Sequence, residues 1–221
     1  MDLKKRDVNR KRKYDSSRRR RWAEENRARI LEVARRLFLA DGYAATPVSR
    51  IADQADVSVE TIYKAFGGKA GLVRSLWERA LEGSNDIPAE RRSDEMRTRE
   101  TDPRRIIENW GRFVTEVAPL GAPIFLLARS AATSDPELAE VLDQAEAARL
   151  DRMEHNARDL LQRGYLRPGI TLAEARDVLW AYSSAELYDL LVIRRGWPIE
   201  RFGRFVAGGM IAALLPASAG H

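Results

Sequence analysis

The chain has no cysteine and two histidines, His155 and His221. Without cysteine there can be no disulfide framework, no thiolate metal site and no cysteine nucleophile, and two histidines are too few for a histidine-rich metal site. The sequence offers no nucleophile paired with a base, and Gly67-Gly68-Lys69 is too short for a phosphate-binding loop. We therefore expect a protein that is not an enzyme and that uses no metal or cofactor.

Long apolar runs and strand-like patterns are also missing. The longest apolar runs, at residues 124–128 and 187–193, are far shorter than a membrane span. The charged N-terminus is not followed by the apolar stretch of a secretory signal, and alternation typical of strands is absent. With 44% hydrophobic residues in 221, the chain can hold one moderate core and a small module. We expect an all-α cytoplasmic protein.

The positive charge is concentrated at the N-terminus. Residues 1–21 contain 11 Lys or Arg against three Asp, so the rest of the chain is slightly acidic although the whole carries +5. Such a segment buries too little apolar surface to fold alone, and we expect a disordered basic arm. It is of the type that binds phosphate backbones by counterion release, or that enters a minor groove; the alternative is a solvated tail.

Residues 46–69 are predicted to form two short helices joined by a turn. Thr46 can cap the first helix with Pro47 at its first position. Asp56 tolerates the left-handed backbone that ends a helix, and Ser58 can cap the second helix. This is the organisation of a helix-turn-helix, in which the second helix offers side chains to the major groove.

The surrounding sequence, residues 29–69, resembles the DNA-binding domain of the tetracycline-repressor-like (TetR) family of bacterial regulators. The resemblance rests on Ile30-Leu31, Ala34, Leu37-Phe38, Gly42-Tyr43, Thr46, Ile51-Ala52, Val57-Ser58, Thr61-Ile62-Tyr63, Phe66, Lys69 and Leu72. Three positions depart from the family pattern, namely Pro47, Asp56 and Ala65, the last of which removes an expected phosphate contact.

DNA contacts are assigned by position along the second helix. Val59 and Thr61 can meet a thymine methyl, Glu60 can accept from a cytosine amine, and Lys64 can donate to guanine or phosphate. The expected phosphate contacts are Thr46, Ser49, Ser58, Tyr63 and Lys69. For Tyr63 the alternative is a core ring whose hydroxyl merely reaches solvent.

Helix caps and turns divide the rest of the chain. The DNA-binding domain is predicted at 22–68, a connecting helix at 69–83, a linker at 84–102 and a tail at 216–221. Asp102-Pro103, Asp135-Pro136 and a capping box at Thr171 and Glu174 mark helix starts between them. The second domain, 103–215, is predicted to contain helices near 103–117, 120–133, 136–163, 172–195 and 198–214.

By the resemblance, this second domain encloses a small-molecule pocket and pairs its last two helices with those of a second subunit. The candidates for a hydrophobic or aromatic ligand are Asn109, Trp110, Phe113, Phe125, Arg129, Trp180, Glu186 and Tyr188. The alternatives are that the aromatic residues fill the core and that Arg129 forms a salt bridge. The helices near 172–195 and 198–214 have apolar stripes that suit either a homodimer or the monomer core, and close helix approach is expected at Gly208 and Gly209.

By the resemblance, we expect a homodimeric transcriptional regulator, most often a repressor in proteins like this, that binds a palindromic DNA operator in the nucleoid of a bacterial cytoplasm and is released by a hydrophobic or aromatic effector. A regulator that activates, or one that responds to no ligand, fits the same residues. The alternative is a nonspecific or architectural nucleic-acid-binding protein driven by the basic arm.

Overall fold

The structure is a computed structural model that describes residues 3–83, 87 and 89–217, and the side chains of 21–83, 87 and 90–217. Every regular element within these ranges is a helix, which confirms the predicted all-α class. The chain divides into two compact units, Met1–Leu72 and Val73–His221. Of the predicted tail, residues 218–221 lie outside the described residues.

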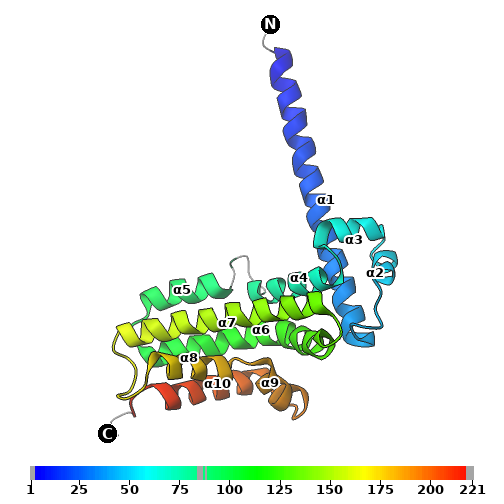
Figure 1. The fold of residues 1–221 in the computed structure, drawn as a ribbon. Coiled ribbons are helices and arrows are strands. Elements are labelled where there is room, and N and C mark those ends of the chain that lie inside the picture. Colours follow the sequence, from blue (N-terminus) through cyan, green and yellow to red (C-terminus); the bar gives the residue numbers. More distant parts are fainter. Residues whose placement is uncertain (1–2, 84–86, 88, 218–221) are drawn as a thin grey trace. The chain divides into compact units, whose positions relative to one another are not determined.

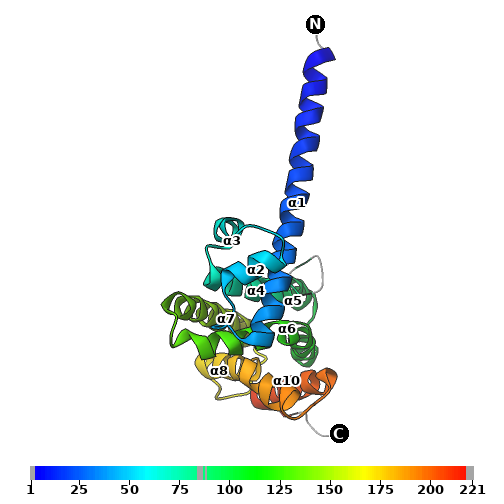
Figure 2. The same cartoon turned by 90° about the vertical axis from the view of Figure 1, so that its right-hand side faces the viewer.

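The first unit contains α1 (Leu3–Asp41), α2 (Val48–Gln54), α3 (Val59–Phe66) and the start of α4 (Lys69–Glu82). Figures 1 and 2 show α2 and α3 beside the C-terminal half of α1. The helices meet through their apolar faces. The residues of this core include Ile30, Leu31, Ala34, Leu37, Phe38, Ile51, Ala52, Ala55, Ile62 and Leu72.

The first helix starts earlier than predicted. The sequence predicted a disordered arm at 1–21 and a helix from Trp22, whereas α1 begins at Leu3. No glycine or proline occurs before Gly42, and Lys and Arg have high helix propensity. The helix therefore continues through the basic stretch, which is a helical extension of the DNA-binding unit.

The second unit consists of the rest of α4 and a stack of helices. These are α5 (Ala89–Arg99), α6 (Pro103–Ala132), α7 (Pro136–Gln162), α8 (Leu172–Tyr182), α9 (Ala185–Tyr188), the π-helical segment η1 (Asp189–Ile193) and α10 (Ile199–Leu214). Figure 1 shows α5, α7, α6, α8 and α10 with their axes roughly aligned. The main packed pairs are α6 with α10, α7 with α8, and α6 with α7.

Three helix predictions in this unit are corrected. The predicted linker at 84–102 contains α5, whose polar sequence is fastened by ion pairs such as Arg92 with Glu116. The two helices predicted at 103–117 and 120–133 form one helix, α6, which continues through Pro119 and Pro123. The predicted helix 172–195 is broken because Ser184 caps a new helix, accepting a hydrogen bond from the Leu187 amide at 3.3 Å.

Among the described residues α6 is the one helix long and apolar enough to cross a membrane. The longest apolar runs in the sequence, at residues 124–128 and 187–193, are shorter than this helix. In the structure, α6 buries Ile106, Ile107 and Trp110 near its start and Ile124 and Phe125 near its end. It packs as a core helix of the second unit, against α7, α9 and α10.

Candidate nucleic-acid interface and ligand pocket

The first helix of the predicted helix-turn-helix starts in an unexpected way. Pro47, not Thr46, occupies the N-cap of α2, and no side chain caps this helix. Thr46 is fully buried, and its hydroxyl donates to the carbonyl oxygen of Gly42 at 2.8 Å. Thr46 therefore braces the loop that follows α1, and its prediction as a phosphate contact is wrong because its side chain does not reach the surface.

The turn between α2 and α3 agrees with the sequence. Asp56 has a φ of 51°, the only positive φ among the described residues other than glycine, and Asx side chains tolerate this conformation. Ser58 then caps α3, because its hydroxyl oxygen accepts a hydrogen bond from the Thr61 amide at 3.1 Å. The turn thus fixes where α3 starts and which of its faces points inward.

Helix α3 has one buried face and one exposed face. Ile62 is fully buried in the unit, while Val59 is 39% and Tyr63 52% exposed. Glu60 and Lys64 are also exposed, and Thr61 is half-buried. The group predicted to read DNA therefore lies on the outward side of the helix, where a major groove could reach it. Contact with particular bases stays a prediction.

The predicted phosphate contacts differ in how free their polar atoms are. Ser49 is exposed, and the hydroxyls of Ser58 and Thr61 share a hydrogen bond of 2.8 Å. The Lys69 ammonium lies over the Tyr43 ring, 4.1 Å from its centroid, and 3.4 Å from the carbonyl oxygen of Ala44. Reaching a phosphate would thus require Lys69 to leave this position.

Two contacts hold the C-terminal end of α3 in place. Arg27 on α1 donates to the carbonyl oxygen of Ala65 at 2.9 Å, and its guanidinium lies 4.4 Å from the centroid of the Phe66 ring. Gly71 on α4 lies so close that a Cβ there would overlap the Phe66 carbonyl oxygen. Arg27 was not predicted from the sequence, in which it is one of several arginines along the first helix.

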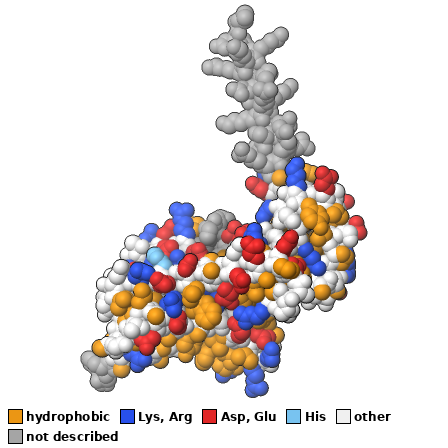
Figure 3. Space-filling view, viewed as in Figure 1, with side chains coloured by type: hydrophobic (Ala, Val, Ile, Leu, Met, Phe, Trp, Pro, Cys, Tyr) orange, Lys and Arg blue, Asp and Glu red, His pale blue; other side chains and the backbone are white. Residues whose placement is uncertain are grey.

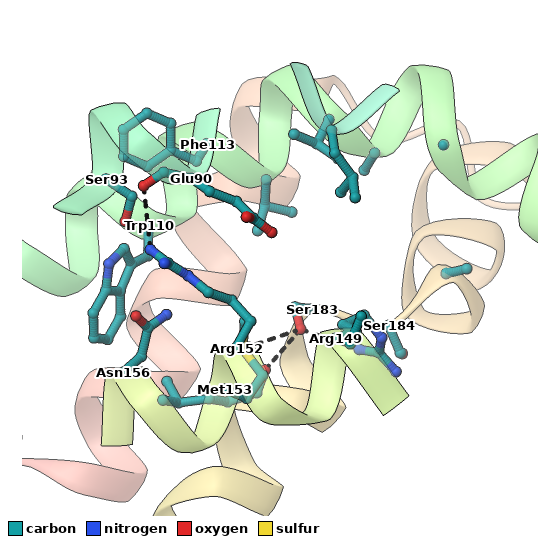
Figure 4. Close-up of a pocket in the computed structure, with 18 of the residues that line it drawn as sticks. Glu90, Ser93, Trp110, Phe113, Arg149, Arg152, Met153, Asn156, Ser183 and Ser184 are labelled. Carbon is teal, nitrogen blue, oxygen red and sulfur yellow. Dashed lines mark hydrogen bonds between the residues drawn. The ribbon is translucent and has the colours of Figure 1, made fainter. Parts of the chain in front are cut away.

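A cavity of about 190 Å³ lies within the second unit. Helices α4 to α10 contribute to it, and Figure 4 shows its polar side chains and several of its apolar ones. On α6 the lining residues recur with helical spacing. These residues are Trp110, Phe113, Val114, Val117, Ala118, Gly121 and Ala122.

Two of the eight predicted ligand residues, Trp110 and Phe113, line this cavity. The other six do not. Tyr188 is buried in the core edge-on to Phe202, with ring centroids 5.6 Å apart, and Phe125 packs on Trp77. Asn109 bonds Arg112, also on α6, and Trp180 lies under the Arg149 guanidinium. These positions follow from tertiary contacts that helix periodicity does not reveal.

Arg129 is paired, as the alternative interpretation held. It forms ion pairs with Glu146, at 3.1 Å, and with Glu186, and its side chain is 45% exposed. Its guanidinium also lies 5.1 Å from the Phe125 ring centroid. The prediction that Arg129 and Glu186 contact a ligand is therefore replaced by a salt bridge between them.

Helix α7 supplies six of the cavity residues that were not predicted from the sequence. They are Ala145, Ala148, Arg149, Arg152, Met153 and Asn156. Their spacing of three and four residues marks one face of a helix, and the small alanines leave room beside the larger side chains. This stripe was a usable signal, but the charged residues within it suggested a solvated face.

Both arginines of this stripe are paired with carboxylates. Arg149 binds Glu146 at 3.0 Å, and Arg152 binds both oxygens of Asp94, at 2.8 and 3.0 Å. Burial opposes the charged form of Asp94, but the hydrogen bond and charge of Arg152, with the charge of Arg97, lower the pKa of Asp94 overall. Burial lowers the pKa of Arg149, against the pull of Glu146. The guanidinium charges beside the cavity are thus compensated.

Hydrophobic side chains remain exposed on α8, η1 and α10. Phe205 is 41% exposed and touches the rings of Trp197 and Tyr182, while Leu190 and Ile193 on η1 are about half exposed. Figure 3 shows hydrophobic side chains gathered over this part of the second unit. Gly208 faces open space, and Gly209 packs on Tyr182. Close helix approach within the unit thus occurs at Gly209, beside α8, and also at Gly111 and Gly203, where α6 meets α10.

No group of three or more His, Asp or Glu side chains within the described ranges is arranged to hold a metal ion.

Comparison with known proteins bears on both units. Residues 30–76 match the family described as bacterial regulatory proteins, tetR family. The chain is 46% identical over 48 residues to the uncharacterized HTH-type transcriptional regulator YvkB of Bacillus subtilis, which is 22% of this chain and 25% of that protein. It is 36% identical over 81 residues to the HTH-type transcriptional regulator TtgR of Pseudomonas putida, 37% of each chain. These alignments thus span about a quarter to over a third of the relatives' lengths.

The likeness to solved structures covers both units. A SmeT–triclosan complex aligns with 89% of this chain and 95% of its own, with a TM-score of 0.68 and 20% identity. At this identity the likeness shows a shared fold. The second unit therefore shares the helical fold of that protein.

Proposed function

We propose that this chain, whose residues 30–76 match the family of bacterial regulatory proteins, tetR family, is a ligand-responsive transcriptional repressor. It binds a palindromic DNA operator as a homodimer, in the cytoplasm at the nucleoid, and a small effector releases it. The observation that carries the proposal is the outward face of α3, with Val59, Glu60, Tyr63 and Lys64 exposed above a fully buried Ile62.

Regulators of this family bind operators, usually as dimers. The exposed apolar residues Leu190, Ile193 and Phe205 support a dimer through η1 and α10, because a soluble monomer rarely exposes a contiguous apolar patch of this kind without a partner. Two reader helices held about 34–36 Å apart then match two half-sites. The change Phe205→Glu should shift the protein from dimer to monomer in analytical ultracentrifugation, and Arg158→Glu, a charge reversal on the exposed side of α7, should not.

The cavity supports the proposed response to an effector. Trp77 and Leu81 line the cavity, and both belong to α4, the helix that starts at Lys69 next to the DNA-binding residues. A ligand that displaces these side chains favours one position of α4 over another. Because such coupling is reciprocal, the ligand and the operator must weaken each other's binding by the same factor. A protein of this fold has been solved as a complex with triclosan, which supports a small-molecule effector.

The decisive test is a titration of the purified protein on its own promoter region and on random DNA of equal length. We expect affinity for the promoter at least about a thousandfold higher at physiological salt. Equal affinity for both would end the proposal of a specific regulator.

Two variants of α3 sort base contacts from phosphate contacts. Lys64→Ala should weaken binding to all sequences and reduce the slope of log affinity against log salt by about 1. Glu60→Ala should instead reduce the discrimination against other bases at one operator position, by about 1–3 kcal/mol. These are matched controls, since each removes one charge from the exposed side of the same helix.

Removal of residues 1–21 tests the nonspecific alternative. The segment carries a surplus of eight positive charges, so its loss should lower affinity for every DNA and flatten the salt dependence. A specific reader keeps its preference for the operator after this truncation. Loss of all binding, specific and nonspecific together, would favour the architectural protein.

A further inference from the structure

Two buried polar atoms beside the cavity have no hydrogen-bond partner in the described structure. They are the indole nitrogen of Trp110 on α6 and the amide oxygen of Asn156 on α7. Both residues line the cavity and are 5% exposed, and Figure 4 shows the two side chains next to each other at one end of it. Buried donors and acceptors in native proteins are almost always paired. This end of the cavity therefore has one donor and one acceptor that a bound molecule can satisfy.

The rest of the cavity is small and mainly apolar, although Arg149, Arg152 and Glu90 also line it. Its walls include Trp77, Phe113, Val117, Met153, Leu179 and Met210. A dry cavity of about 150 Å³ holds benzene in a well-studied protein, and this one measures about 190 Å³. The space therefore suits one aromatic ring with small substituents.

The charges around the cavity favour a neutral ligand. Of its lining arginines, Arg149 is paired with Glu146 and Arg152 with Asp94, so neither offers uncompensated positive charge to a carboxylate. Glu90 also lines the cavity and is acidic. An anionic ligand would lose its hydration without gaining a free counterion.

We propose that the effector is a neutral single-ring phenol, whose hydroxyl accepts a hydrogen bond from the Trp110 indole N–H and donates one to the Asn156 amide oxygen. A hydroxyl serves because it is both a donor and an acceptor. The inference rests on the proposed function, since it names the class of ligand for the same regulatory site.

Three probes of nearly equal size test the ligand class by isothermal titration calorimetry at pH 7.5. They are 4-methylphenol, toluene and 4-methylbenzoate. We expect 4-methylphenol to bind about tenfold more tightly than toluene, which corresponds to about 1.4 kcal/mol, because toluene leaves both polar atoms unpaired. The benzoate should bind most weakly. Equal binding of phenol and toluene, tighter binding of the benzoate, or no binding of the phenol would each overturn the proposal.

Variants locate the binding site. Trp110→Phe keeps an aromatic ring and removes the donor, and Asn156→Leu keeps the volume and removes the acceptor. Each should reduce the preference for 4-methylphenol over toluene several-fold while leaving toluene binding nearly unchanged. Asn156→Leu should also leave the stability of the ligand-free protein unchanged or higher, because it removes an unpaired buried group. Trp180→Phe, outside the cavity, is the control and should keep the full preference.

DNA titrations separate this inference from the proposed function. If 4-methylphenol binds as expected, it should weaken operator binding of the wild type and not of Asn156→Leu at the same concentration. If the protein binds its operator specifically and the phenol has no effect, the proposed ligand class is refuted, but the proposed function as a transcriptional regulator is not. Absence of specific operator binding would refute the regulator even if the phenol bound the cavity.

Discussion

Each of the two units is stabilised internally by a different kind of contact. In the first unit, helix α3 is positioned by local features of neighbouring residues, such as the N-cap at Ser58 and the left-handed backbone at Asp56. In the second, helices distant in sequence are joined by ion pairs such as Arg152 with Asp94, 58 residues apart, around a cavity with unpaired polar atoms. A DNA reader needs a rigid platform, whereas an effector site needs space and groups left for a ligand.

The sharpest difference between the units should appear when a methyl group is added to a helical glycine of each. Gly71→Ala places a methyl on the Phe66 carbonyl oxygen, while the position at Gly208 is open. We expect Gly71→Ala to lower the free energy of unfolding by about 3 kcal/mol and to abolish operator binding. Gly208→Ala should be neutral or stabilise by up to about 1 kcal/mol. Urea unfolding followed by circular dichroism measures both, and equal effects would contradict the tight packing at Gly71.

The next effect concerns the attachment of α5. Asp94→Asn removes the shared carboxylate partner of Arg97 and Arg152, and should cost about 1–2 kcal/mol, less than a fully buried pair because Asp94 is 41% exposed. Amide hydrogen exchange should become faster in α5 and unchanged in α3. The exposed Asp143 on α7 provides the control substitution, Asp143→Asn.

The same carboxylate predicts a pH dependence. The pKa of Asp94 is lowered in the folded protein below its ordinary value of 3.8. Its contribution is therefore fully present above that value and is lost as the pH falls through the lower folded pKa. The difference in stability between wild type and Asp94→Asn should be constant near neutral pH and shrink in acid. A difference that grew as the pH fell would show that the sign is wrong.

A smaller pair of changes compares one helix cap in each unit. Ser58 caps α3, and Thr171 caps α8 through a complete capping box. Ser58→Ala and Thr171→Ala should each cost about 1 kcal/mol of stability. Only Ser58→Ala should also weaken operator binding when measured well below the unfolding temperature, because it loosens the N-terminus of the reading helix. Equal losses of DNA affinity in the two variants would contradict the separation of the units.

The smallest expected effect is at Arg27. Its guanidinium lies over Phe66 and donates to Ala65 on an exposed surface, so Arg27→Ala should cost about 0.5–1 kcal/mol. Arg27→Lys, which retains the charge but not the planar group, should cost less. Thermal unfolding measures the stability of both variants. If Arg27→Lys loses as much stability as Arg27→Ala, the hydrogen bond to Ala65, and not the charge over the Phe66 ring, holds the end of α3.

Sequence reasoning worked where neighbouring residues control the backbone. The turn at Asp56, the cap at Ser58 and the outward set on α3 were all predicted, because capping and helix periodicity act over a few residues. The prediction failed at Thr46. The local pattern placed this residue at a helix cap, whereas in the structure its side chain is buried under the loop that follows α1. Sequence reasoning also failed to recognise α5, since that helix has almost no apolar stripe and is fastened by arginines from a helix more than 50 residues away.

The cavity shows the same limit in finer detail. Trp110 and Phe113 were identified among the candidates, yet Tyr188 and Phe125 have equally aromatic side chains and fill the core instead. Arg149, Arg152 and Asn156 were overlooked because their polarity suggested solvent. Whether a side chain faces a cavity, a neighbouring ring or water depends on which helices cross beside it.

The amino-acid sequence by itself determined the helical class, the helix-turn-helix with its outward residues and the basic N-terminal segment, because each depends on caps, periodicity and charge within a short stretch of chain. The tertiary structure decided which aromatic residues surround the cavity, which charges are neutralised and which polar atoms stay unpaired. These properties arise only when residues separated by tens of positions are packed together, and the burial that results sets the strength of every charge and hydrogen bond in the site.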